Sequence, residues 1–267
     1  MAKDTNIPWT DHTFNGWIGC NKVSTGCKNC YAENLNNRFK YATEGWGKGR
    51  PRHRTSPDNW RQPLVWDRKA AASGVRRKVF CASMADVFDE EVPVGWRSDL
   101  FDLINKTPNL DWLLLTKRPE YAVKFSGELV LLPNVWMGVT VETQEMANQR
   151  SPILLSIPAA KRFMSIEPML GSVDLRSWLN KPWCPTHDYD SGFCLQDCGD
   201  WRRIEWVICG GETGHHARNM DPAWVRAIRD QCLENNVPFF FKQWGGAKGH
   251  DAQLDGQEWQ QFPGDVK

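Results

Sequence analysis

The chain has 267 residues, of which 41% are hydrophobic, and this composition excludes an intrinsically disordered chain. No apolar run reaches the about 18 residues that a membrane span needs, and the N-terminal segment lacks the apolar core of a signal peptide. We therefore expect a soluble, intracellular protein in a reducing compartment, where clustered cysteines indicate metal binding or catalysis in preference to disulfides.

The net charge of +1 hides a local asymmetry. Residues 38–78 contain twelve Lys and Arg residues against three acids, which gives +9 for this segment and −8 for the rest of the chain. Trp46, Trp60 and Trp66 lie among these cations. Cations interleaved with aromatic side chains suit a polyanion with stackable bases, so we predict contact with nucleic acid or a nucleotide. The alternative is a solvated loop and helix face with no special role.

Short apolar runs, rich in β-branched and aromatic residues, alternate with helical stretches along the chain. We predict strands at 13–19 (a weak pattern), 78–83, 111–116, 135–141, 162–167, 205–211 and 237–243. Helices are predicted at 30–40, 93–106, 143–156 and 221–235. Continuous apolar strands that alternate with helices indicate a parallel sheet covered by helices. The predicted fold class is therefore α/β: a partial or complete (β/α) barrel of six or seven parallel strands, formed by a single domain over residues 1–267.

Each predicted strand from residue 78 onward ends in polar or small residues. Barrel enzymes build their sites at the carboxyl ends of the strands, and a core strand needs no carboxylate or amine at its end. We therefore predict a polar, ligand-lined mouth, with salt bridges between loops and helix caps as the alternative. The residues concerned are Ser83, Asp86, Lys117, Arg118, Thr140, Glu142, Glu167, Gly210, Gly211, Glu212, Lys242 and Gln243.

Three of the nine cysteines, Cys20, Cys27 and Cys30, are spaced C-x6-C-x2-C after the first predicted strand. A structural zinc site needs a fourth ligand, and the spacing of the only nearby histidine, His12, is not a usual one. Three thiolates alone would also make a zinc-bound water a poor nucleophile. A [4Fe–4S] cluster takes cysteine thiolates, and three of them leave the fourth iron open for a non-protein ligand.

A cysteine triad after the first strand of a (β/α) barrel resembles the radical SAM superfamily, although the commonest spacing there is C-x3-C-x2-C. Further segments between residues 9 and 246 are similar to a family of phage-associated, radical-SAM-like proteins. They are WTDHTFN, GCNKVSTGCKNCYAE, SMADVFDEEVP, LLTKRPE, VWMGVTVE, RFMSIEPM, WVICGGETG and FFFKQWGG. The resemblance implies a barrel of the radical SAM type and a cluster on Cys20, Cys27 and Cys30. It also implies that the fourth iron binds S-adenosylmethionine, which is cleaved to a 5′-deoxyadenosyl radical after one-electron reduction.

The resemblance also implies roles for the strand ends. Ser83 and Asp86 would contact the amino group of S-adenosylmethionine, and Thr140 and Glu142 its ribose hydroxyls. Glu167 and the turn 210–212 would line the adenosine or the substrate, with the glycines letting the backbone approach a ligand closely. Lys117, Arg118, Lys242 and Gln243 would bind the substrate, where the cations suit a phosphate or carboxylate. No catalytic residue is assigned.

A second set of metal ligands falls in a predicted insertion at 181–203. Cys184, His187, Cys194 and Cys198 make a full tetrahedral zinc set, and zinc would order a loop too small for its own core. An auxiliary iron–sulfur cluster and unliganded thiols are the alternatives. The remaining cysteines, Cys81, Cys209 and Cys232, lie in apolar patterns and are predicted to be buried without a ligand.

The leading functional hypothesis is a radical SAM enzyme that modifies or rearranges a nucleobase-linked group in phage DNA, as in thymidine hypermodification. The alternatives are a radical SAM DNA repair lyase and a non-enzymatic, zinc-stabilised nucleic-acid-binding protein. The enzyme hypotheses require a reductant such as flavodoxin or ferredoxin and place the protein in the cytoplasm of an infected bacterial host.

Overall fold

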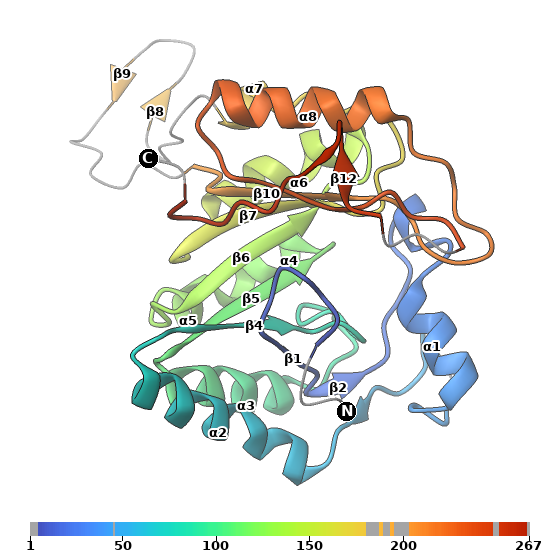
Figure 1. Ribbon diagram of the computed structural model, residues 1–267. Coiled ribbons are helices and arrows are strands. Elements are labelled where there is room, and N and C mark those ends of the chain that lie inside the picture. The colour runs from blue at the N-terminus through green and yellow to red at the C-terminus, as the bar shows by residue number, and fades with distance from the viewer. Residues whose placement is uncertain are drawn as a thin grey trace.

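The computed structural model describes residues 5–44, 46–179, 203–247 and 251–265, and the backbone of 187–188 and 193–194. Its centre is a seven-stranded parallel sheet in the order β1-β4-β5-β6-β7-β10-β11 (Figure 1). The strands are β1 His12–Phe14, β4 Arg77–Cys81, β5 Leu110–Thr116, β6 Val135–Thr140, β7 Lys161–Ile166, β10 Trp206–Gly210 and β11 Phe239–Gln243. β1 and β11 are the two ends of this order, so the sheet is an open half-barrel. The predicted fold class is confirmed in its partial form.

Helices connect successive strands and cover the outer, convex face of the sheet, as parallel strands require. The helices are α1 Tyr31–Phe39, α2 Pro57–Ser73, α3 Val94–Asn105, α4 Pro119–Ala122, α5 Ser126–Leu129, α6 Gln144–Ser156, α7 Arg176–Leu179 and α8 Pro222–Glu234, with 3₁₀ turns η1 Thr25–Cys27 and η2 Val123–Phe125. Short two-residue strands complete the described elements: β2 Trp17–Ile18 with β3 His53–Arg54, β8 His187–Asp188 with β9 Phe193–Cys194, and β12 Gln253–Leu254 with β13 Gln257–Glu258. No helix in the described part of the chain is both long and apolar enough to cross a membrane.

The concave face of the half-barrel is filled by aromatic side chains. Alternate residues of each strand point inward, and Phe163, Trp206 and Phe240 are fully buried there. Gly138 has room for no side chain, because a Cβ atom at this position would overlap the Phe163 ring. This floor fills the lower part of the barrel, and open space remains above it, toward the carboxyl ends of the strands.

Segments near the two ends of the sequence pack against this floor from the open side of the half-barrel. Trp9 packs on Phe80 with ring centroids 4.6 Å apart, and Phe262 packs on Trp206 at 5.4 Å. The chain before Phe262 also pairs with the edge strand β11: the Phe241 N–H donates to Trp259 O at 2.7 Å. Covering an edge strand in this way satisfies backbone groups that would otherwise be free to pair with another chain.

The basic segment 38–78 differs from its predicted arrangement. It contains the 17-residue helix α2, which the sequence pattern did not reveal. Trp66 is buried and stacks on His12, and the partly buried Trp60 packs against Phe14 with the Arg54 guanidinium 4.5 Å from its ring centre. Half of the cations also pair with carboxylates: Arg52, Arg54, Arg61, Arg76, Arg77 and Lys78. The segment as a whole is therefore no uniform cationic surface.

The candidate zinc ligands fall where little is described. Cys184 and Cys198 lie outside the described residues, and His187 and Cys194 are described only as backbone partners in the pair of β8 with β9. Zinc at this set therefore stays a prediction.

Candidate functional site

A cavity of about 650 Å³ opens at the carboxyl ends of the strands. Most of the predicted site residues border it, although they come from loops far apart in the sequence: Cys20, Cys27, Cys30, Ser83, Asp86, Lys117, Arg118, Thr140, Glu167, Gly211, Glu212, Lys242 and Gln243. Glu142 and Gly210 are not among the lining residues. Trp9 and Tyr31, which the sequence did not assign to a site, form part of the wall, and so does Trp46 of the basic segment.

The three cysteines are held by one loop between β2 and α1. Cys20 follows β2, Cys27 ends the turn η1, and Cys30 is the residue that precedes the first turn of α1. All three are partly exposed free thiols that border the cavity. Within the described residues, no three His, Cys, Asp or Glu side chains lie close enough to bind one metal ion. An iron–sulfur cluster does not require three side chains to meet at one metal ion, because each thiolate binds a different iron. The three cysteines therefore fit a cluster.

Burial favours the protonated form of two of these thiols. It raises the pKa of Cys20 to about 12, with a further contribution from the nearby Asp86 carboxylate, and it also raises the pKa of Cys30. Because thiolates are the metal-binding form, loading a metal here would release protons from the site.

The cysteine loop rests on a buried carboxylate. Glu142, which follows β6, is fully buried and accepts a hydrogen bond from Ser24 in the middle of the loop. Its other oxygen accepts from Arg150 Nη1 of α6 at 2.7 Å. Gly26 lies directly against this carboxylate, where a Cβ atom would overlap it. Glu142 thus positions the loop between Cys20 and Cys27, and this differs from the ribose contact expected from the sequence.

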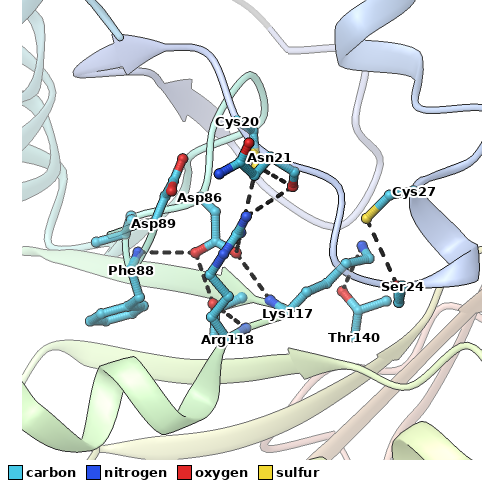
Figure 2. Close-up of polar contacts among 12 residues, drawn as sticks. Cys20, Asn21, Ser24, Cys27, Asp86, Phe88, Asp89, Lys117, Arg118 and Thr140 are labelled. Carbon is cyan, nitrogen blue, oxygen red and sulfur yellow. Dashed lines mark hydrogen bonds and ion pairs between the residues drawn. The ribbon is translucent and has the colours of Figure 1, made fainter. Parts of the chain in front are cut away.

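A second buried ion pair lies beside Cys20 (Figure 2). Arg118 Nη1 donates to Asp86 Oδ2 at 3.0 Å and points at Cys20 Sγ at 3.6 Å. Its other terminal nitrogen donates to Asn21 O at 2.8 Å. Asp86 accepts further bonds from the Thr116 hydroxyl and from the backbone, so its carboxylate is well satisfied by the protein. The pair fixes the first cysteine and keeps a positive charge next to its sulfur.

The central part of the cavity carries polar groups with spare bonding capacity. Lys117 Nζ donates to Thr140 Oγ1 at 3.2 Å, and no ion pair of Lys117 occurs among the described residues (Figure 2). Ser165, the neighbour of Thr140 on β7, has a buried hydroxyl without a protein partner in the described chain. An ammonium group and hydroxyls of this kind suit an anionic or hydroxylated ligand.

On the far side of the cavity Glu167 and Lys242 form an ion pair between the ends of β7 and β11. Gln243 is only 7% exposed and also borders the cavity. Gly210, the last residue of β10, and Gly211 lie closely against protein atoms, and Gly211 also borders the cavity. A Cβ at Gly210 would lie 3.1 Å from Glu167 Cγ, and one at Gly211 would overlap the carbonyl of residue 244.

Glu212 joins the two ends of the half-barrel above the cavity. Its carboxylate accepts two bonds from the Arg218 guanidinium, at 2.8 and 2.5 Å, and one from Asn29 Nδ2 at 2.9 Å. Arg218 also donates to Thr25 O at 3.0 Å, so the loop after β10 is tied to the cysteine loop. Neither Asn29 nor Arg218 was predicted. Asn29 stands between two cysteines and could have been suspected, whereas nothing in the local sequence marks Arg218.

Comparison with known proteins identifies the family. A model described as "Protein of unknown function (DUF5131)" matches residues 4–263, and the chain belongs to that family. No curated protein matches the sequence.

Solved structures of spore photoproduct lyase mutants are similar in fold. One, with bound AdoMet and dinucleoside spore photoproduct, is 11% identical, with a TM-score of 0.47 over 88% of this chain and 64% of that chain. A second mutant is 11% identical, with a TM-score of 0.46 over 91% of this chain and 67% of that chain. The chain thus spans about two thirds of the length of these proteins.

Proposed function

We propose that this protein is a radical SAM enzyme whose [4Fe–4S] cluster is held by Cys20, Cys27 and Cys30. The observation that supports it best is the position of three cysteines, from one short loop, on the wall of a cavity at the carboxyl ends of a parallel half-barrel. When bound, the cluster and S-adenosylmethionine would supply a 5′-deoxyadenosyl radical for hydrogen abstraction.

The chain's own residues would bind and orient the reactants and exclude water. The three thiolates would hold three irons, and Arg118 would keep positive charge beside the Cys20 sulfur. Lys117, Thr140 and Gln243 are placed to bind the polar groups of S-adenosylmethionine or the substrate. The aromatic floor of Phe163, Trp206 and Phe240 would keep water from entering beneath them.

For the substrate we favour a nucleobase-linked group in phage DNA, of the thymidine hypermodification type, and a DNA repair lyase is the second candidate. Lys117, which borders the cavity and makes no ion pair with described residues, supports a phosphate-bearing substrate. Mass spectrometry of nucleosides from phage DNA, grown with and without this gene, tests the choice. A nucleoside that changes only when the gene is present would identify the product, and unchanged nucleosides would contradict a DNA substrate.

Anaerobic purification tests the cluster. We expect a brown protein that absorbs near 400 nm and carries roughly four irons per chain. Cys27→Ala should lose the iron, and with it the 5′-deoxyadenosine formed from S-adenosylmethionine and dithionite. Cys232→Ala is the matched control, because this cysteine is buried in α8 far from the loop in sequence and should keep the iron.

A colourless protein that contains only zinc would contradict the proposal and favour a zinc-stabilised nucleic-acid-binding protein. The same metal analysis also tests the second metal set that we propose. Zinc that is lost in Cys198→Ser, while iron is retained, would place it in the insertion.

A further inference from the structure

Helix α1 presents an unusual surface directly after the third cysteine. Tyr31, Leu35 and Phe39 are 46%, 37% and 50% exposed, and Tyr41 just after the helix is 45% exposed. Residues four apart share one face of a helix, so the first three form a stripe that continues to Tyr41. Large apolar side chains that gather on a surface in this way mark a contact site. We call Tyr31, Leu35, Phe39 and Tyr41 the α1 stripe.

The α1 stripe continues into the cavity. Tyr31 borders the cavity, and its hydroxyl donates to Ser83 O at 2.6 Å, which fixes the ring at the rim. Trp46 borders the same cavity from the next loop, and the Gly47 N–H holds that loop to Cys20 O at 3.1 Å. Figure 1 shows α1 to one side of the barrel, apart from α2, α3 and α8. A ligand that enters the cavity can therefore extend along the stripe without meeting these helices.

Cations accompany the aromatic rings. The Arg38 guanidinium lies 5.0 Å from the centre of the Phe39 ring, which in turn lies 5.6 Å from the Tyr41 ring. Lys40 and Arg50 are exposed and, like Arg38, make no ion pair within the described part of the chain. Residues 19–50 contain six Lys and Arg residues but only two acids, and one of these, Glu33, is already paired with Lys22 at 2.7 Å. The charge of this region therefore complements a polyanion.

We propose that the α1 stripe and the cations beside it bind unpaired nucleotides of a nucleic-acid strand, next to the nucleotide whose base enters the cavity. This inference rests on the proposed function and specifies that the nucleic-acid substrate is bound as an unpaired strand. Base stacking on aromatic side chains beside a positively charged track is how proteins bind single strands without sequence preference. A redox protein docked on the stripe is the alternative. Such a partner would not need to enter the cavity, whereas the stripe continues into the cavity through Tyr31 and Trp46.

Fluorescence anisotropy with a labelled single-stranded DNA oligonucleotide tests the aromatic part of this surface. The double variant Phe39→Ala/Tyr41→Ala of the anaerobically purified holoprotein should bind at least about tenfold more weakly, because each base–aromatic stack contributes substantially. Leu131→Ala/Leu233→Ala is the matched control, since both residues are exposed hydrophobics elsewhere and should leave the affinity unchanged. Equal affinity of the stripe variant and the wild type would overturn the proposal.

A salt titration tests the cations. Lys40→Gln/Arg50→Gln should reduce the slope of log affinity against log salt by about 1.4, or about 0.7 for each lost phosphate contact with a single strand. Arg68→Gln/Lys69→Gln is the control, because these exposed cations belong to the same basic segment but lie on α2. An equal reduction of this slope in both double variants would assign binding to the whole basic segment and overturn the proposal.

Two further measurements separate this surface from the proposed function. The stripe variants should still form 5′-deoxyadenosine with dithionite and S-adenosylmethionine, which shows that the cysteine loop is intact. A wild type that forms none, yet binds the oligonucleotide through the stripe, would contradict only the enzyme proposal. If the variants bind the oligonucleotide normally but are reduced more slowly by flavodoxin, the stripe is a redox-partner site and the nucleic-acid proposal is wrong.

Discussion

Glu142 shows how a residue can serve a site that its side chain does not border. Its carboxyl group is fully buried, and Arg150 and Ser24 donate hydrogen bonds to its two oxygens. Those contacts hold the cysteine loop in place at the carboxyl end of β6. Removing one partner of such a buried pair costs about 3–5 kcal/mol in comparable proteins, because the other charge is left without compensation. Loop position and core stability are therefore coupled at this residue.

Gly26→Ala should separate these two effects. The added methyl group overlaps the Glu142 carboxyl group, so the loop must move outward and carry Cys27 with it. We expect an unfolding free energy lower by about 1–3 kcal/mol, as for other overpacked sites, and less than half of the wild-type iron per chain. Gly127→Ala is the control because a Cβ there meets nothing within 4 Å. Normal iron content in Gly26→Ala would show that the contact with Glu142 does not position the cysteines.

The elements differ in how well the sequence predicts them. The predicted bounds of six strands of the main sheet, β4, β5, β6, β7, β10 and β11, are confirmed to within about two residues. A strand buried on both faces must be a continuous apolar run, which the sequence shows directly. Helix α2 was missed because its 17 residues contain two prolines, which are typical of a loop. The sequence feature that marks the start of α2 is Ser56 followed by Pro57, a capping residue and a proline at the first helical position. In the structure Ser56 Oγ accepts a hydrogen bond from the Asn59 N–H at 3.3 Å.

Ser56→Ala tests whether this cap sets the start of α2. Without the hydroxyl, one of the free N–H groups of the first turn loses its partner, and the unfolding free energy should fall by about 1 kcal/mol. Ser56→Asp keeps an acceptor at the same position and should stay close to the wild type. Chemical denaturation followed by far-UV circular dichroism measures both variants. A loss of the same size in Ser56→Asp would mean that the side chain acts in another way.

At the scale of the whole molecule, the half-barrel does not close on itself, and side chains brace it at two places. Trp9 and Phe262 pack on the aromatic floor from the open side, and Glu212 with Asn29 and Arg218 joins the two sides above the cavity. The sequence predicted that the strand ends would meet, since parallel strands carry their carboxyl ends to one edge. It could not predict the brace, because Asn29 and Glu212 are 183 residues apart and meet only when the sheet curves.

The brace should depend on pH. Burial alone would raise the pKa of the Glu212 carboxyl group, but hydrogen bonds from Arg218 and Asn29 outweigh it and lower the pKa below its ordinary value of 4.5. A carboxyl group whose pKa is lower in the folded chain stabilises the fold above its unfolded pKa, and this contribution is lost as pH falls through the folded pKa.

Glu212→Gln should therefore lower the unfolding free energy by about 1.5–3 kcal/mol at pH 7, the range for hydrogen bonds to charged groups, and by progressively less below about pH 4.5. Thermal unfolding of both proteins between pH 7 and pH 3 measures this convergence. Asp58→Asn is the control, because its ion pair with Arg61 is exposed and should contribute little at any pH. A constant difference between Glu212→Gln and the wild type across this range would mean that the brace acts through packing. The charge on Glu212 would then not be what holds the cysteine loop to the far edge of the half-barrel.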